Sequence, residues 1–218
     1  MRHIDRDLDE LKRSILLMGA MVEESINKAI TALVDRREEL AAEVIGTDCL
    51  IDQHELLIEE ECLKLLALHN LVATDLRFVV TVMKVGNDLE RMGDLSENIA
   101  ERASFLARHP PIAETQDLGR IADIVRTIVR RSLDALVALD TDLARQVCGA
   151  DDEVDGLHRA TFVQVQEIMR RDPATIARAL QTLSCSRQLE RIADLATNIA
   201  EDVVFLVEGE SIRHRYRG

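Results

Sequence analysis

The stretch that decides the fold is DLERMGDLSENIAE at residues 88–101, because it returns as QLERIADLATNIAE at residues 188–201. The groups Leu-Glu-Arg, Asp-Leu and Asn-Ile-Ala-Glu keep their places in both copies. In each copy the apolar residues recur every three to four positions, which is typical of one face of an α-helix. The sequence therefore contains the same long amphipathic helix twice.

Weaker matches extend the repeat upstream of this helix. The segment VIGTDCLID at 44–52 corresponds to VCGADDEVD at 147–155, and ALV at 32–34 corresponds to ALV at 135–137. The offset between the copies falls from 103 upstream to 100 downstream, which a three-residue deletion in a connecting turn explains. Because about 100 residues is the size of a small domain, we predict two repeats, residues 1–109 and 110–218.

Each repeat contains three long segments with helical periodicity. Only five residues are Phe or Tyr and none is Trp, while nine Gly and three Pro leave few turns, so the composition favours packed helices over sheets. We therefore predict an all-α fold of two tandem three-helix bundles. Pro110 and Pro111 separate the bundles, Pro173 starts a helix, and Thr74 is a candidate N-cap. The predicted helices are 5–36, 38–69, 74–107, 115–140, 142–171 and 173–208.

Charge and hydropathy limit the possible partners and compartment. The net charge of −13 repels a phosphate backbone, so it argues against nucleic-acid binding and favours cations or basic protein surfaces. The longest stretch without Asp, Glu, Lys or Arg, residues 65–74, is about half the length that a membrane span needs. The charged start of the chain leads into no signal-peptide core, so we expect a cytoplasmic protein without membrane insertion.

The four cysteines show no spacing typical of metal sites or redox motifs. Each lies in a helical pattern among apolar neighbours, so we expect reduced residues of the core. These residues are Cys49, Cys62, Cys148 and Cys185.

The third helix of the first repeat carries four acidic residues on one narrow face. At about 100° per residue, their carboxylates fall within about 60° of one another. The preceding helix has acids at the same spacing, and the two helices are expected to be antiparallel neighbours. Like charges one turn apart each cost about 0.2–0.5 kcal/mol, so facing rows predict a polynuclear cation site. The rows are Glu90, Asp94, Glu97 and Glu101 on one helix, and Asp48, Asp52, Glu55 and Glu59 on the other.

The second repeat keeps a reduced version of these rows. Thr197 replaces one acid of the third helix, and His158 lies one turn beyond Asp155, so that both can reach a common ion. A leaner metal site is expected there. Its candidate ligands are Glu190, Asp194 and Glu201 on the third helix, and Asp151, Asp155 and His158 on the second.

Two other interpretations of the acidic rows stay open. The rows can be a solvated face of a metal-free helical scaffold, because Arg91 and Arg191 offset part of the charge. Carboxylate-rich helices also build di-metal oxidases and ferritins, but these need Glu-x-x-His pairs, and the nearest match is a single Asp155-x-x-His158. No Gly-rich phosphate loop or HExxH motif occurs either, so we expect no enzymatic activity.

The duplicated Glu-Arg-x-x-Asp-x-x-x-Asn-Ile-Ala-Glu segments, together with Ala-Thr-Asp-Leu-Arg at 73–77, resemble the PhoU family of phosphate-transport accessory proteins. The resemblance covers nearly the whole chain. It implies tandem three-helix bundles that carry multinuclear iron or zinc clusters, with magnesium or manganese as further candidates. The positions that match the family's metal motifs are Glu90, Asp94, Glu190 and Asp194.

The resemblance also implies a function. Such proteins restrain the phosphate transporter and keep the phosphate-starvation response off, by contact with the transporter's ATPase subunit and a sensor histidine kinase. A homodimer is expected on the same basis. This chain departs from the family pattern at Leu71, where Pro is common, at Leu195, where His is frequent, and at residues 175–177, where the second repeat lacks Asp-Leu-Arg.

Overall fold

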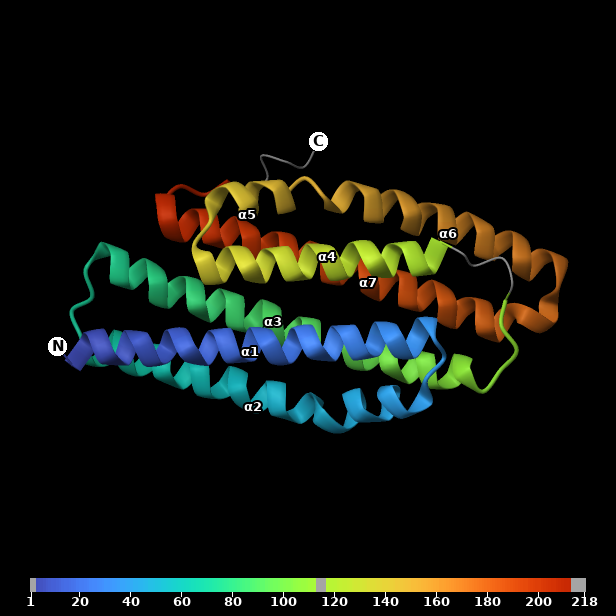
Figure 1. Ribbon diagram of the computed structural model, residues 1–218, viewed down its shortest axis with the longest axis horizontal. Coiled ribbons are helices and arrows are strands. Elements are labelled where there is room, and N and C mark those ends of the chain that lie inside the picture. The colour runs from blue at the N-terminus through green and yellow to red at the C-terminus, as the bar shows by residue number, and fades with distance from the viewer. Residues whose placement is uncertain (1–2, 113–116, 213–218) are drawn as a thin grey trace.

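The computed structural model describes residues 3–112 and 117–212, and in those ranges it contains helices and no strands. The helices form two three-helix bundles that lie side by side along their length (Figure 1). The predicted fold class is therefore confirmed. The elements are α1 (His3–Val34), α2 (Glu38–Leu68), α3 (Ala73–Ala107), α4 (Asp117–Ala138), α5 (Thr141–Val147), α6 (Asp151–Arg171), the 3-10 turn η1 (Pro173–Thr175) and α7 (Ile176–Glu208).

The helices form where apolar residues recur at helical spacing. In α1, the buried side chains follow one another at intervals of three or four residues, so the helix lies on the core from Leu11 to Leu33. Burial of this stripe, rather than intrinsic propensity, stabilises helices of such length. The stripe of α1 consists of Leu11, Ile15, Met18, Val22, Ile26, Ala29, Ile30 and Leu33.

Helices α3 and α7 lie at the centre and pack on each other, so both are buried on several sides. They run antiparallel, and two polar contacts between them obey the internal symmetry. Lys84 Nζ of α3 lies 3.6 Å from Asp202 Oδ1 of α7, and Arg102 Nε of α3 donates to Ser184 Oγ of α7 over 2.6 Å. Since 184 and 202 are the repeat equivalents of 84 and 102, the two bundles are related by a pseudo-two-fold arrangement and share one core.

The second helix of the second repeat differs from the prediction. A single helix over 142–171 is wrong, because the chain breaks between α5 and α6 at residues 148–150. The side chain of Asp140 caps α5 by accepting from the N–H groups of Asp142 and Leu143. The break places Asp152 and Glu153 in the first turn of α6, where the helix dipole favours negative charge. In the first repeat, the equivalent residues continue α2 without interruption.

Two smaller predictions also fail. Helix α3 begins at Ala73 after Val72, so Thr74 lies inside the helix and is not its N-cap. Cys49 is exposed on α2, contrary to the prediction, whereas Cys62, Cys148 and Cys185 are buried thiols as expected. Burial raises the pKa of the Cys62 and Cys185 thiols to about 12, which keeps both protonated.

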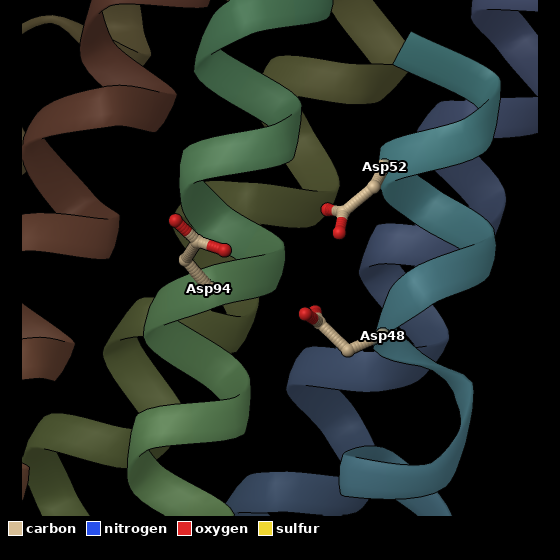
Figure 2. A group of neighbouring side chains, drawn as sticks. All are labelled: Asp48, Asp52 and Asp94. Carbon is tan, nitrogen blue, oxygen red and sulfur yellow. The ribbon is translucent and has the colours of Figure 1, made fainter. Parts of the chain in front are cut away.

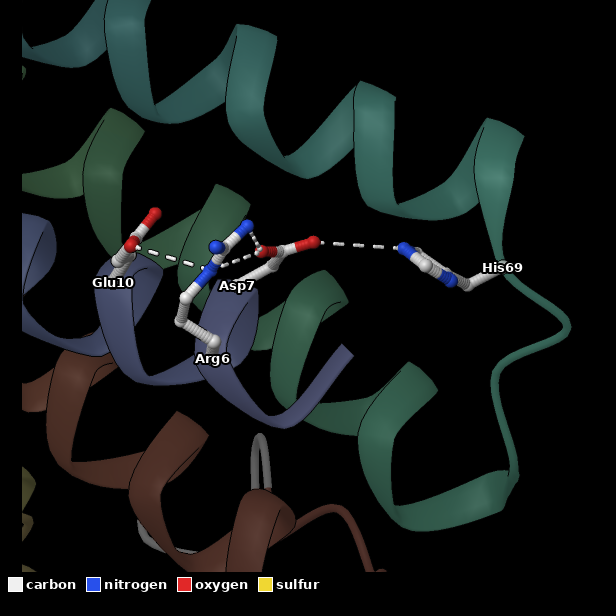
Figure 3. Close-up of polar contacts among 4 residues, drawn as sticks. All are labelled: Arg6, Asp7, Glu10 and His69. Atoms are coloured by element: carbon white, nitrogen blue, oxygen red, sulfur yellow. Dashed lines mark hydrogen bonds and ion pairs between the residues drawn. The ribbon is translucent and has the colours of Figure 1, made fainter. Parts of the chain in front are cut away.

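At the end of the first bundle where α2 leads into α3, polar contacts join α1 to the residue that follows α2 (Figure 3). His69 follows α2, and its Nε2 lies 3.7 Å from Asp7 Oδ2 near the start of α1. Arg6 joins Asp7 and Glu10 on the same turn of α1. None of the helices in residues 3–112 and 117–212 combines the length and apolar content of a membrane span.

Candidate metal centre

Three acids of the two rows meet between α2 and α3: Asp48 and Asp52 project from α2 beside Asp94 of α3 (Figure 2). Because the helices are antiparallel, the rows meet in opposite order. Asp48 lies within electrostatic reach of Glu97, Asp94 lies near Asp52, and Glu90 lies near Glu55. The carboxylate side chains of Asp48, Asp52 and Asp94 each offer an oxygen, and these oxygens lie within 4.8 Å of one another.

Asp48 is the most confined of these carboxylates. Its side chain is buried, and Oδ1 has no hydrogen-bond partner in the structure. Burial, together with the charges of Glu97, Asp52 and Asp94, raises the pKa of Asp48 to about 6. A buried carboxylate oxygen without a donor costs free energy, and a cation bound at this point would remove the cost.

Four further carboxyl groups of the two rows also have a raised pKa. Burial is the largest cause in every case, and neighbouring carboxylates add to it. Arg91 is exposed and lowers the pKa of Glu90 and of Asp94, yet the pKa of each stays above its ordinary value. Arginine therefore offsets only part of the negative charge. The groups with a raised pKa are Asp48, Glu55, Glu90, Asp94 and Glu97.

Gly93 sets the distance between the two rows. A Cβ at this position would lie 3.2 Å from the side-chain carbons of Ile51 and 3.4 Å from Asp48 Oδ1. The missing side chain thus lets α2 approach α3 where the three carboxylates converge. Sequence reasoning missed this residue, although the signal was visible: a glycine stands inside a helix beside Asp94, where the second repeat has Ala193.

Glu101 lies at the end of the row and away from the convergence. Its side chain is 59% exposed, and its Oε2 lies 3.7 Å from Arg102 Nη1. Its charge raises the pKa of Glu97. Within the row on α3, Asp94 thus lies at the convergence with Asp48 and Asp52, Glu97 lies within electrostatic reach of Asp48, and Glu101 is the exposed outer end.

The second repeat brings together fewer of its predicted ligands. Glu190 of α7 lies near Asp155 of α6. Burial and the charge of Asp155 raise the pKa of Glu190, although Arg187 and Arg191 act to lower it. His158 Nδ1 is 2.9 Å from Ser186 Oγ, which leaves Nε2 for another partner. Burial and the charge of Arg187 lower the pKa of His158 despite the opposing effect of Asp155, and the lowered pKa favours the neutral imidazole.

The other candidates of the second repeat are less informative. Asp194 is half-buried on α7, and Glu201 is buried on the same helix. Thr197 Oγ1, which stands where the first repeat has Glu97, is buried without a hydrogen-bond partner. The side chain of Asp151 lies outside the described residues. Among the residues that the structure describes, the cluster of Asp48, Asp52 and Asp94 is the one group of three or more ligand atoms at metal-binding distance.

The fold and this site define a class of protein: a duplicated helical bundle in which paired carboxylate rows line the contact between two helices. The chain belongs to the PhoU family, because the PhoU domain matches residues 15–103 and again residues 118–203. One match lies in each predicted repeat.

Curated relatives and solved structures agree with this assignment. The phosphate-specific transport system accessory protein PhoU homolog of Aquifex aeolicus is 39% identical over 97% of this chain and 96% of its own length. The homolog of Pseudomonas putida is 37% identical over 98% of this chain and 84% of its own length. Their name describes an accessory protein and no enzyme.

Two crystal structures are similar along nearly their whole length. PhoU from Pseudomonas aeruginosa superposes with a TM-score of 0.93 at 35% identity, over 95% of this chain and all of that one. The phosphate transport system regulatory protein PhoU from Streptococcus pneumoniae gives a TM-score of 0.87 at 31% identity, over 96% of this chain and 99% of that one. The bundles are thus arranged as in these relatives.

Proposed function

We propose that this chain is a cytoplasmic accessory regulator of phosphate transport that restrains the transporter and the phosphate-starvation response when phosphate is plentiful. It acts without catalysis, by contact with the transporter's ATPase subunit and with a sensor histidine kinase. Support comes from its membership of the PhoU family and from the names of relatives that are alike over nearly their full length. The net charge of −13 suits docking on basic protein surfaces.

The first repeat is proposed to bind a multinuclear metal cluster, with iron or zinc as the leading ions and magnesium or manganese as further candidates. The observation that carries this proposal is the buried, partnerless Oδ1 of Asp48 beside Asp52 and Asp94. The donor set consists of carboxylates, which hard and borderline cations accept. Asp48, Asp52 and Asp94 would hold the metal, with Glu55, Glu90 and Glu97 completing its ligands. The bound ion would supply positive charge that locks α2 against α3.

A second and leaner site is proposed between α6 and α7, around Asp155, His158 and Glu190. The proximity of Asp155 to Glu190 and the free Nε2 of His158 support it. Arg187 and Arg191 offset part of the negative charge there. We therefore expect this site to bind metal more weakly than the site of the first repeat.

Metal analysis of protein purified without chelator tests the site. The variant Glu90→Ala/Asp94→Ala should lose most of the metal of the first repeat and keep its helicity, because Asp94 is exposed and Glu90 only half-buried. The matched control is Asp5→Ala/Asp9→Ala, which removes two acids at the same spacing from α1 and should keep the metal. Protein that contains no metal, or variants that bind it equally, would support the metal-free scaffold instead.

Affinity purification from the host, with and without phosphate, tests the regulatory role. We expect the ATPase subunit of a phosphate transporter and a sensor kinase to be retained, and deletion of the chain to activate phosphate uptake constitutively. If neither partner is retained and uptake is unchanged, the proposal fails. The dimer implied by the family stays a prediction, which sedimentation equilibrium checks.

A further inference from the structure

A cavity of about 430 Å³ lies between the two bundles at one end of the molecule. The starts of α1 and α3 meet the ends of α4 and α7 there (Figure 1). Its buried walls are apolar and include Ile15 of α1, Val82 and Val85 of α3, and Leu136 of α4. A volume of this size lies in the range of small-molecule sites. Helix α2 contributes none of the lining residues, so the cavity is separate from the candidate metal centre.

Thr81 is the buried polar side chain of this cavity. It is 0% exposed, and its Oγ1 has no hydrogen-bond partner in the structure. A threonine inside a helix commonly donates to the carbonyl four residues earlier. Thr161, which is almost equally buried, does so to the carbonyl of Leu157. An unpaired buried hydroxyl costs free energy, so the hydroxyl of Thr81 is available to a group that enters the cavity.

The repeat supplies an internal comparison, because an equivalent cavity lies at the opposite end of the bundles. Leu33 and Leu106 line it, and they are the repeat equivalents of Leu136 and Leu206, which line the first cavity. Arg36 ties the linker over this second cavity by donating to the main-chain carbonyls of Leu106 and His109. The second cavity is therefore closed by the chain itself.

The first cavity differs from its equivalent at the mouth. Leu139 stands at the position of Arg36, and both residues have a left-handed backbone, with φ of 53° and 58°. Leu139 lines the cavity and is 42% exposed. Since a leucine cannot hold main-chain carbonyls as Arg36 does, the mouth stays open and apolar.

The charges at the mouth indicate which ligand enters. Asp9 of α1 and Asp75 of α3 line the cavity, and neither forms an ion pair with another residue that the structure describes. Lys12 is the basic residue of the lining. Two acids against one lysine, on a chain of net charge −13, favour a cation. Asp75 and Thr81 are six residues apart on α3, a rise of about 9 Å, so the ligand needs polar groups at both ends.

We propose that this cavity binds a small amphiphilic amine. Its apolar body lies between the bundles, its ammonium group lies at Asp9 and Asp75, and a hydroxyl or similar group at its other end bonds to Thr81. Phe78 also lines the cavity and favours an aromatic body. Such a ligand contacts α1 and α3 of the first repeat and α4 and α7 of the second, so it stabilises the folded chain at their junction.

Tyramine tests the site on the full chain, because it joins a phenol to an ammonium group through two carbons. In calorimetric titrations we expect saturable binding that is tighter than that of phenethylamine, which lacks the hydroxyl, and of 4-ethylphenol, which lacks the charge. The anion 4-hydroxyphenylacetate should bind most weakly. Methyl NMR should show shifts at Val85 and Leu139, with no change in bound metal.

The hydroxyl contact is tested by Thr81→Val. This variant should weaken tyramine binding by about three- to tenfold and leave phenethylamine binding unchanged, because it removes one hydrogen bond. Its Tm should not fall, since the hydroxyl is unpaired in the free protein. The matched control Thr161→Val removes a buried hydroxyl that is already bonded, so it should lower Tm and bind tyramine like the wild type.

The charge contact is tested by Asp9→Asn/Asp75→Asn. We expect weaker binding of both amines, by about tenfold, and unchanged binding of 4-ethylphenol. The control Asp35→Asn/Asp123→Asn removes two exposed acids far from the cavity and should have no effect. Leu139→Arg places the arginine of the equivalent cavity at this mouth, and it should weaken both amines by adding positive charge.

Four outcomes would overturn the inference. Tyramine that does not saturate the protein would leave water as the content of the cavity. Equal affinity for tyramine and 4-hydroxyphenylacetate would remove the role of Asp9 and Asp75. Tyramine binding that Thr81→Val does not weaken, or NMR shifts confined to residues outside the cavity, would place the probe elsewhere. None of these outcomes bears on the regulatory role, which affinity purification tests by itself.

Discussion

Asp48 shows how one residue couples the metal site to stability. In the unfolded chain its pKa takes the ordinary value of 3.8, whereas in the folded, metal-free protein it is about 6. Below the lower value, both states hold the proton and Asp48 contributes no pH dependence. As pH rises toward 6, the unfolded state releases the proton more readily, so the folded state loses stability. Glu55, Glu90, Asp94 and Glu97 act with the same sign.

We therefore predict that Asp48→Asn stabilises the chelated protein at pH 7 and has little effect at pH 4. The expected gain is about 1 kcal/mol, or about 2–4 °C in Tm, because water at the exposed Asp52 and Asp94 screens part of the repulsion. Thermal unfolding at both pH values measures it. In metal-loaded protein the sign should reverse, since the variant loses a ligand. A variant that destabilises the chelated protein at pH 7 would contradict the electrostatic account.

At the scale of elements, the distance between α2 and α3 decides whether the carboxylates can share an ion. Gly93 permits that distance, because a methyl group there would crowd Ile51 and Asp48 Oδ1. Alanine also stabilises a helix interior relative to glycine by about 1 kcal/mol, whereas crowding a packed contact costs about 1–3 kcal/mol. The helix-propensity gain and the crowding cost therefore partly cancel in stability, whereas nothing cancels the effect of crowding on metal binding.

For Gly93→Ala we accordingly predict a small change in Tm and a marked loss of bound metal. The matched control is Gly46→Ala, since Gly46 lies inside α2 with no atom within 4 Å of an added Cβ. The control should raise Tm and keep the metal. Thermal unfolding and metal analysis on the same preparations separate these effects. Equal metal content in both variants would show that the close approach is not needed.

At the scale of the whole molecule, contacts between α3 and α7 join the repeats into one folding unit. Asp202 is 2% exposed and lies near Lys84, and Arg102 reaches Ser184. Arginines also contact the chain just beyond the last helix of each repeat. Arg77 lies against Gly209, where any side chain would collide with it, and Arg178 Nη1 donates to the carbonyl of Pro110 over 2.8 Å. Arg178 thus makes, one position later in the repeat, the contact that the short side chain of Ala177 cannot make.

The shared core predicts a single cooperative unfolding transition for the full chain. Asp202→Ala should move that transition as a whole to lower temperature, by about 1–3 kcal/mol, because it removes a buried polar partner at the junction. The control Asp134→Ala removes an exposed acid of α4 and should leave Tm nearly unchanged. Calorimetry measures the number of unfolding transitions. Two separate transitions, or a variant that shifts only one of two, would mean that the repeats fold independently.

Much of this architecture can be predicted from local sequence patterns. The repeat at 88–101 and 188–201, the helical spacing of apolar residues and the rows of acids are one-dimensional patterns. They were sufficient to predict the all-α tandem fold and the two acidic rows on neighbouring helices. A helix has a fixed period, so the residues that share its face can be found without knowing what it packs against. The acidic rows followed from that period alone.

The tertiary structure decided what depends on contact between elements. It buried Asp48 and left Cys49 exposed, it broke the second helix of the second repeat before Asp151, and it set Arg178 against Pro110. None of these follows from periodicity, because the burial and charge of a side chain depend on the neighbouring helices and not on its own helix. Helical period placed the carboxylates on their faces, but only the packing of α2 on α3 brought three of them within reach of one ion.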